Sequence, residues 1–376
     1  MRRPRTAVLI STALTLGTAP LLLAGCIYPS PSPGPNAQLR AVTAVNTSNA
    51  WAVGNFVDRS GQHDLMEHWN GKNWQEVLLP PPFGTSLSGI TAVNASNIWA
   101  VGGVRTLHFN GVSWRSIGDP GGIAIGDVAS GSDAAVYGLG ESLPIPGIPL
   151  DHQPLPHYGL MVMTAANWRS VSAIPTAVSP DTCDISKGAE DLSVVKANDV
   201  WVVGNGTLGN TTTVCTRALH WNGSTWQSTA MPAITGSPRL YAVSARAAND
   251  VWAVGAVFTM NASHANVENS LVMHWNGAKW AVLPSPDSRG DAFLKDIDAT
   301  AEGVWAVGAA MSSPISSEDA LIKKWTGTSM ADQSTPDLPF ADFTGVSVAD
   351  GAVTSVGWYQ PRSSVVATLT DRRNAS

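Results

Sequence analysis

A short pattern recurs down the whole chain: an apolar residue, tryptophan, two small apolar residues and glycine. Full copies lie at 50–54, 98–102, 200–204, 251–255 and 304–308, and weaker copies fit at 134–138 and 353–357. In the weaker copies we align Ala135 and Thr354 with the tryptophan. A repeat of roughly 50 residues that contains several short apolar segments is typical of a β-propeller. We therefore predict an all-β, seven-bladed propeller with mostly four-stranded blades.

Residues 87–116 give the clearest single unit. Segments 90–93, 98–102 and 106–109 read as strands separated by turn residues, Asn110-Gly111 is a strong hairpin signal, and 113–116 begins a fourth strand. In the last unit only three strands are visible, at 343–348, 353–357 and 365–370. We expect a three-stranded final blade that closes the ring by packing of inner strands, without hydrogen bonds from the N-terminal segment.

The tryptophans follow the repeat. Because alternate residues of a strand share a face, Trp51 and Val53 point one way while Ala52 and Gly54 point the other. A large residue that meets small residues of the next blade allows tilted sheets to pack without voids. We interpret the tryptophans as core residues, with Trp358, which follows the last repeat, left open as a ligand contact.

The N-terminus has the features of an export signal. Arg2, Arg3 and Arg5 precede an apolar run, which ends at 23–26 in Leu-Ala-Gly-Cys. This ending resembles the lipobox of bacterial lipoproteins, which implies lipidation of Cys26; an ordinary signal peptide and a membrane-spanning anchor are the alternatives. Four prolines alternate with Ser and Gly over 29–35, as in an extended spacer. The predicted organisation is a signal peptide at 1–25, a lipidated tether at 26–38 and a propeller at 39–376.

Charge and cysteine content narrow the functional classes. The chain has 22 Lys and Arg against 28 Asp and Glu, which argues against nucleic acid as a partner. Of the three cysteines, Cys183 and Cys215 remain once Cys26 is assigned to lipid. Outside the cytoplasm we expect them to form a disulfide, with two free buried thiols as the alternative.

The sequence pattern resembles kelch and Asp-box propeller repeats. The hairpins Asn70-Gly71-Lys72-Asn73-Trp74 and Asn222-Gly223-Ser224-Thr225-Trp226 look like shortened Asp-box turns with Asn in place of Asp. The chain is still more similar to the Trp-Ala-Val-Gly and His-Trp-Asn-Gly repeats of exported bacterial proteins. This resemblance extends over about residues 39–370 and implies the fold, but propellers include both enzymes and binding proteins.

Candidate chemical groups are scattered over the repeat. His68, His108, His220 and His274 occupy one repeat position in four different blades, so they are expected to be structural residues and no metal site is predicted. Asp127, Asp191, Asp296 and Asp298 lie at or near first strands, which line the channel of a propeller; paired carboxylates there would suit a glycosidase or lyase. A sialidase-like site should also have a cluster of arginines, and the first strands have nearly none, with Arg40 and Arg239 at their edges.

The lengths of the connections favour a binding role. Turns between first and second strands and between third and fourth strands are short, so the long connections, such as 139–158 and 257–270, must emerge on the opposite face. We predict a monomeric, lipid-anchored, extracytoplasmic propeller that binds a glycan or protein through this loop-rich face, without enzymatic activity or cofactor. Candidate ligand contacts are His152, His157, Tyr158 and Trp358. The alternative is a hydrolase or lyase with carboxylates at the channel mouth.

Overall fold

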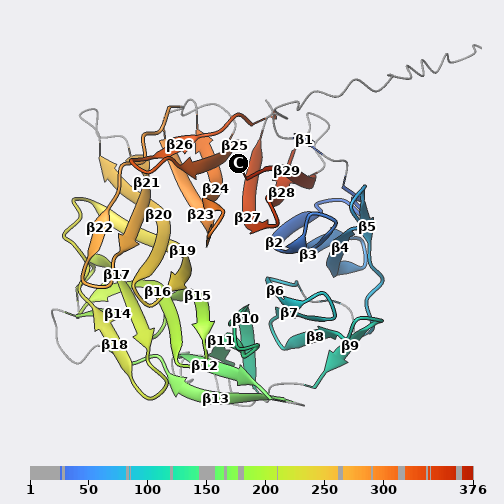
Figure 1. The fold of residues 1–376 in the computed structure, drawn as a ribbon, viewed down its shortest axis with the longest axis horizontal. Coiled ribbons are helices and arrows are strands. Elements are labelled where there is room, and N and C mark those ends of the chain that lie inside the picture. Colours follow the sequence, from blue (N-terminus) through green and yellow to red (C-terminus); the bar gives the residue numbers. More distant parts are fainter. Residues whose placement is uncertain are drawn as a thin grey trace, which may run out of the picture.

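The strands form seven separate sheets around a central axis, as expected for a seven-bladed propeller (Figure 1). This computed structural model describes residues 26–27, 30–81, 84, 86–118, 122–143, 157–164, 167–176, 182–209, 211–260, 266–288, 291–311, 318–335, 338, 340–360 and 366–375. Within these ranges, no helix is long and apolar enough to cross a membrane.

Each blade is a run of antiparallel strands that follow one another outward from the axis. Blade one has β2 (Gln38–Asn46), β3 (Asn49–Asp58), β4 (Gly61–Trp69) and β5 (Trp74–Glu76); blade two has β6 (Gly89–Asn94), β7 (Asn97–Gly102), β8 (Arg105–Phe109) and β9 (Trp114–Ile117). Blade three has β10 (Ile123–Ser130), β11 (Val136–Ser142), β12 (Tyr158–Met163) and β13 (Trp168–Ala173); blade four has β15 (Ala189–Lys196), β16 (Asp199–Leu208), β17 (Val214–Trp221) and β18 (Trp226–Thr229). Blade five has β19 (Ser237–Ala247), β20 (Asp250–Met260), β21 (Asn266–Trp275) and β22 (Trp280–Val282). Blade six has β23 (Asp291–Thr300), β24 (Gly303–Met311), β25 (Glu318–Trp325) and β26 (Met330–Asp332); blade seven has β27 (Ala341–Ala349), β28 (Ala352–Tyr359) and β29 (Ala367–Asn374).

The core lies between neighbouring blades. Trp51 and Val53 of blade one pack in one buried cluster with Ile98 and Ala100 of blade two, and the same arrangement recurs between blades four and five. The five tryptophans of the second strands are all buried: Trp51, Trp99, Trp201, Trp252 and Trp305. Large side chains therefore meet small ones across the gap between blades, as the alternation of the repeat predicts.

The glycine that ends each full repeat has a steric cause. A Cβ atom on Gly54 would lie 1.9 Å from the carbonyl oxygen of Gln38, and on Gly255 1.9 Å from that of Arg239. Both carbonyls belong to the inner strand of the same blade, which approaches the second strand too closely for any side chain. Glycine at this position is therefore required by strand pairing within the blade.

In blade three, the strand pairing differs from the alignment of the weak repeat that the sequence suggested. Gly140 pairs with Ile125 of the inner strand, as Gly54 pairs with Leu39 in blade one. Tyr137, three residues earlier, therefore occupies the tryptophan position, and the alignment of Ala135 with tryptophan is wrong by two residues. Tyr137 is buried, and its hydroxyl donates to the carbonyl of Ala197 in the next blade over 3.1 Å. A phenol replaces the indole as a large, amphipathic core residue.

Ring closure follows the prediction only in part. The three full strands of blade seven are confirmed, and its inner strand contacts blade one, where Ala44 N–H donates to Ser347 Oγ over 3.0 Å. However, the two-residue strand β1 (Cys26–Ile27) pairs with Arg372 and Asp371 on the outer edge of β29. The expectation that no N-terminal residue pairs there is wrong, because β29 continues beyond the predicted end at residue 370 and offers a free edge.

The described part of the proline-rich segment also lies against the propeller. Thr368 donates from its N–H to Ser32 Oγ over 3.2 Å and from its hydroxyl to the Pro31 carbonyl over 3.1 Å. The Pro35 carbonyl accepts a hydrogen bond from the N–H of Val57 over 3.1 Å. We call residues 26–27 and 30–36 the N-terminal strap, because they join blade seven to blade one.

The disulfide between Cys183 and Cys215 is present, with 5.8 Å between the Cα atoms. Cys183 begins β14 (Cys183–Asp184), which pairs with the end of β16, whereas Cys215 lies within β17. Cys183 therefore lies in a short additional strand at the edge of blade four. The disulfide ties this additional strand to the third strand of blade four.

Candidate ligand-binding site

Six of the seven inner strands have an irregularity near their first residues, at the end that lies on the loop-rich face. The register of pairing skips one residue in six blades. The skipped residues are Arg40, Gly126, Glu190, Tyr241, Lys295 and Thr344. In blade two Ser88 holds the matching place, just before β6, where its N–H donates to the carbonyl of Val101 over 2.8 Å. A bulge turns a side chain away from its usual face, and all seven residues line one cavity of about 350 Å³ around the axis. We call them the bulge ring.

The members of the bulge ring differ chemically, and several are held from behind by polar partners. Arg40 Nε donates to Asn55 Oδ1 over 2.9 Å, and Asn205 Nδ2 donates to Glu190 Oε1 over 3.1 Å. The ammonium of Lys295 forms an ion pair with the buried carboxylate of Asp342. The ring therefore presents two cations, one carboxylate, one phenol and two hydroxyls at a fixed position.

The predicted channel carboxylates lie one residue deeper than the bulge ring, and they join neighbouring blades. Asp127 accepts the N–H of Leu192 over 3.3 Å, and Asp191 accepts the N–H of Val243 over 2.7 Å. Asp296 accepts the N–H of Val346 over 2.7 Å in the same way. Each of these three carboxylates thus satisfies a backbone donor of another blade's inner strand.

Two residues further along the inner strands, a second set of side chains also accepts backbone N–H groups from neighbouring blades. Asp298 accepts the N–H of Val348 over 2.7 Å. Serine hydroxyls take this role elsewhere: Ser193 for Ala245, Ser244 for Ala299 and Ser347 for Ala44, at 2.9, 3.0 and 3.0 Å. The side chains that line the channel therefore also form hydrogen bonds that join neighbouring blades.

Burial changes the acidity of these groups. Burial raises the pKa of Asp296 to about 7 and that of Asp298 to about 6, against the stabilising backbone hydrogen bonds. Burial also raises the pKa of Asp191 well above its ordinary value, helped by repulsion from Asp127 and a hydrogen bond between the two carboxyl groups. The oxygens of these carboxyls are already engaged as acceptors for the backbone N–H groups of neighbouring blades.

The structure places the four predicted ligand contacts in different surroundings. His152 lies outside the described residues, and His157 is exposed, with its backbone N–H on Ser142 Oγ at 3.1 Å. Tyr158 is half-buried at the start of β12, where burial, followed by the carboxylates of Glu141 and Glu190, raises its pKa. Trp358 is partly buried in β28 of blade seven. Tyr158 is thus close to the bulge ring through Glu190, whereas Trp358 lies in blade seven, where it pairs with Asp342 of the inner strand.

Glu190, Tyr241 and Lys295 were missed by sequence reasoning. In a regular strand, adjacent side chains point to opposite faces. If Asp191 and Asp296 face the channel, the residues before them, Glu190 and Lys295, would therefore be expected to point away from it. The bulge removes this restriction and brings both residues to the channel. Their position in the repeat is regular. Each bulge residue directly follows the inner-strand residue that pairs with the glycine of the repeat.

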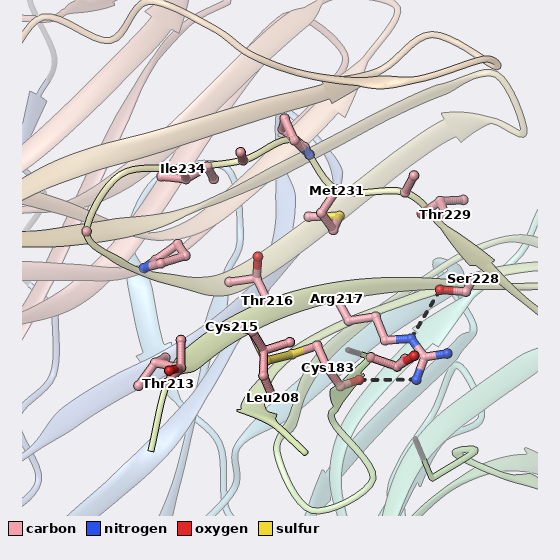
Figure 2. A pocket seen from close by; sticks show the side chains of 17 residues that line it. Cys183, Leu208, Thr213, Cys215, Thr216, Arg217, Ser228, Thr229, Met231 and Ile234 are labelled. Atoms are coloured by element: carbon pink, nitrogen blue, oxygen red, sulfur yellow. Dashed lines mark hydrogen bonds between the residues drawn. A yellow bond between two sulfur atoms is a disulfide. The ribbon is translucent and has the colours of Figure 1, made fainter. Parts of the chain in front are cut away.

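A separate cavity of about 570 Å³ lies beside the disulfide, between blades four and five (Figure 2). Arg217 borders this cavity and is nearly buried. Its Nη1 donates to the Cys183 carbonyl and its Nε to Ser228 Oγ, both over 3.2 Å. These contacts hold β14 in place, which gives the arginine a structural role.

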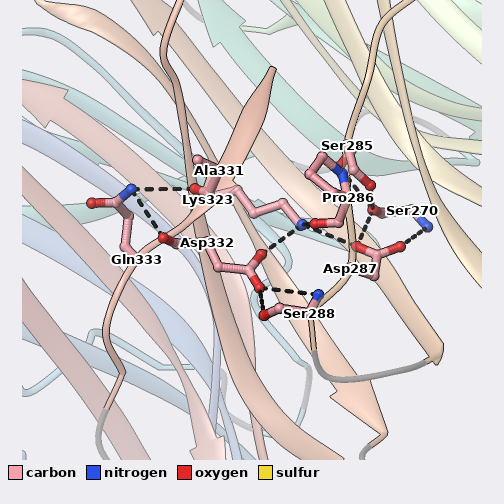
Figure 3. A network of polar contacts seen from close by, with 9 residues as sticks. All are labelled: Ser270, Ser285, Pro286, Asp287, Ser288, Lys323, Ala331, Asp332 and Gln333. Carbon is pink, nitrogen blue, oxygen red and sulfur yellow. Dashed lines mark hydrogen bonds and ion pairs between the residues drawn. The ribbon is translucent and has the colours of Figure 1, made fainter. Parts of the chain in front are cut away.

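A third polar cluster, on blade six, is satisfied internally (Figure 3). Lys323 is fully buried and its ammonium contacts Asp332 at 2.6 Å, the Pro286 carbonyl at 2.8 Å and Asp287 at 2.9 Å. Two carboxylates and a carbonyl match the three donors of the ammonium. This cluster fixes the connection from blade five to blade six and leaves no donor of Lys323 for a ligand.

Among the residues that the structure describes, no group of three or more His, Cys, Asp or Glu side chains is placed to hold a metal ion. The repeated histidines bond instead within their own blades; His68 Nε2 lies 2.9 Å from Asn49 Oδ1, and His220 Nε2 lies 2.8 Å from Asp199 Oδ1. Their role in the structure is therefore the one expected from the repeat.

Comparison with known proteins shows the fold alone. No family model matches the chain, and no curated protein matches it. Among solved structures, YCF48 bound to D1 peptide is similar, with 13% identity, a TM-score of 0.56, and coverage of 94% of this chain and 97% of that one. The polysaccharide lyase Uly1 has 8% identity, a TM-score of 0.57 and coverage of 92% and 90%; the phage phi92 endosialidase has 11% identity, a TM-score of 0.51 and coverage of 94% and 69%. These neighbours include a peptide complex and two proteins named as enzymes.

Proposed function

We propose that this protein is a lipid-anchored, extracytoplasmic propeller that binds a glycan or protein ligand through its loop-rich face. The observation that supports this most directly is the bulge ring, because it places six side chains of varied chemistry and one glycine around a single cavity on that face. A rigid scaffold that presents varied side chains at the ends of its strands is a common basis of recognition.

The place of Cys26 agrees with an anchor that leaves the loop-rich face free. Cys26 pairs with Arg372 of β29, and the Arg372 guanidinium donates to the carbonyl of Thr47 over 3.1 Å. Thr47 lies in the short turn between β2 and β3, so Cys26 is near the short-turn face at the rim of the disc. A lipid on Cys26 would then hold this face toward the membrane.

A hydrolase or lyase is the alternative, and two similar structures have enzyme names. The hydrogen bonds of Asp127, Asp191 and Asp296 favour binding, since each carboxylate already accepts a backbone N–H from another blade. A general acid or base must instead direct an oxygen at the substrate.

The anchor is tested by cell fractionation of the full chain. A Cys26→Ala variant should appear in the medium, because it lacks the residue that would carry the lipid chains. Ser32→Ala, which leaves Cys26 in place, should stay with the membrane. Membrane association of the Cys26→Ala protein would contradict lipid anchoring.

The binding face is tested with residues 26–376 on arrays of polysaccharides and peptides. Arg40→Ala should abolish binding to any ligand found, whereas Lys72→Ala, an exposed cation on a short-turn hairpin, should not. Each ligand is also incubated with protein and analysed for cleavage products. Turnover that disappears in Asp191→Asn would support the enzyme and contradict the binding proposal.

A further inference from the structure

A third cavity, of about 470 Å³, adjoins the channel mouth between blades five and six. It is lined by Tyr241, Phe258, Glu268, Phe293, Lys295 and Glu318. Tyr241 and Lys295 belong to the bulge ring and line both this cavity and the channel cavity, so the two spaces are neighbours on the loop-rich face. We call this third cavity the blade five–six groove.

The groove has an excess of negative charge. Glu268 and Glu318 line it, and burial raises the pKa of Glu268, with further contributions from the charges of Asp291 and Glu318. The one cation in the lining, Lys295, is already neutralised by Asp342. One oxygen of the buried Asp342 carboxylate has no partner among the described residues. The repulsion of Glu268 by Asp291 and Glu318 would be relieved by a cation from outside.

The groove also has aromatic surfaces that accept cations. The Arg239 guanidinium lies 5.9 Å from the centroid of the Phe258 ring, and the Lys295 ammonium lies 5.2 Å from that of Phe293. Both rings therefore already have cationic neighbours within the protein. Phe258 is only partly buried, so apolar surface remains for the aliphatic part of a ligand.

We propose that the blade five–six groove binds a lysine or arginine side chain of an extended peptide segment. This inference rests on the proposed function, since it requires that the loop-rich face binds a ligand. A long aliphatic stem suits Phe258, Phe293 and Tyr241, and a terminal cation suits the carboxylates. This combination of an apolar stem and one terminal charge belongs to basic side chains, whereas an amino sugar has hydroxyls along its whole body.

The test uses an acetylated and amidated pentapeptide, Gly-Ser-Lys-Ser-Gly, with purified residues 26–376. Saturation-transfer NMR should show contact at the lysine methylenes, and titration should give at least tenfold weaker binding for the same peptide with norleucine in place of lysine. Glu268→Gln combined with Glu318→Gln should weaken binding of the lysine peptide at least tenfold. Glu76→Gln, an exposed carboxylate on the outer strand of blade one, is the control and should have no effect.

Three results would overturn the inference. Equal affinity for the lysine and norleucine peptides would exclude charge recognition, and binding of glucosamine oligomers without peptide binding would assign the groove to a glycan. The third result is a ligand found on the arrays that loses binding to Arg40→Ala protein but binds normally to the variant with both glutamate substitutions. In that case the groove inference fails while the proposed function stands. An unchanged thermal midpoint for each variant shows that the folded protein is compared in every case.

Discussion

At the scale of residues, the repeat encodes a three-part cluster of an acceptor, a tryptophan and a histidine in blades two, four and five. In blade four, Asp199 Oδ1 accepts from the indole Nε1 of Trp201 over 3.2 Å and lies 2.8 Å from His220 Nε2. The Trp201 and His220 rings are stacked, with centroids 4.5 Å apart. The same pair of hydrogen bonds, with Asn or Asp as the acceptor, is present in blades two and five. Two donors thus share one acceptor, which explains why Asn or Asp precedes the tryptophan by two residues.

Removal of that acceptor should destabilise the blade. Asp199→Ala leaves the indole N–H of Trp201 and the imidazole of His220 without their shared partner, and an unsatisfied buried donor costs about 1–3 kcal/mol. We expect a loss of about 2–4 kcal/mol in the free energy of unfolding, measured by urea denaturation. Asp199→Asn keeps an acceptor oxygen and should lose less than about 1 kcal/mol. Equal losses in the two variants would show that the shared acceptor is unimportant.

The buried acids predict a stability that falls as the pH rises. Burial raises the pKa of Asp298 to about 6, so the folded protein retains a proton that the unfolded chain releases at lower pH. Protonation therefore stabilises the fold, and this stability is lost between about pH 4 and 6 as the pH increases. Asp296, with a pKa of about 7, and Asp342, with a pKa of about 6, act in the same direction.

Asp298→Asn tests this pH dependence. The amide oxygen can still accept the N–H of Val348 and carries no charge, so the variant should be more stable than the wild type at pH 8 by up to about 3 kcal/mol, and similar at pH 4. Thermal midpoints across this pH range give the comparison. Asp58→Asn is the control, since Ser60 and His63 lower the pKa of that exposed carboxyl to about 2. A parallel pH profile for Asp298→Asn and wild type would refute the assignment.

At the scale of elements, short additional segments are fixed by covalent or ionic contacts. β14 has only two residues, and it is held by the disulfide and by Arg217 against the Cys183 carbonyl. The buried Lys323 does the same for the connection at Pro286 and Asp287 (Figure 3). Both contacts lie away from the bulge ring and stabilise the loop-rich side of the blades.

Loss of the disulfide should therefore cost stability but leave the channel mouth intact. The two cysteines are 32 residues apart, and closing a loop of that size contributes about 3–4 kcal/mol by the chain-entropy estimate. We expect this loss of unfolding free energy in Cys183→Ala combined with Cys215→Ala. Wild-type protein under reducing conditions should show the same loss. Both proteins should still bind any ligand whose binding depends on Arg40. Unchanged stability on reduction would contradict this account.

At the scale of the whole molecule, the ring is closed by two sets of contacts. Inner strands of blades seven and one meet through Ser347 and Thr344, whose hydroxyl donates to the Leu39 carbonyl over 2.7 Å. The N-terminal strap crosses the same junction further out, from Arg372 at one end to Val57 at the other. It also covers the buried carboxyl of Glu67, to which the Ser30 hydroxyl donates. Because the strap caps the edge of β29, it protects the last blade from pairing with other chains.

A chain that begins at Ala37 should be less stable than one that begins at Cys26. The shorter chain loses the pairing with β29 and the hydrogen bonds at Thr368 and Val57, which together are worth about 2–4 kcal/mol. Thermal and urea unfolding of the two proteins give the difference. Size-exclusion chromatography should also show more association for the shorter chain, because its β29 edge is exposed. Identical stability and size would mean that the strap is a passive tether.

The sequence by itself determined the repeat, the seven blades and the partners in the disulfide, because each depends on local patterning or on the small number of cysteines. It also indicated the structural histidines, since a position repeated in separate blades cannot converge on one ion. Only the tertiary structure decided that Tyr137 replaces a tryptophan, that the seven residues of the bulge ring share one cavity, and that the strap pairs with β29. Strand alternation is a local rule, whereas a bulge is set by pairing with a neighbour, and the blade five–six groove combines side chains from five strands. Their meeting depends on how two blades pack, which no single repeat specifies.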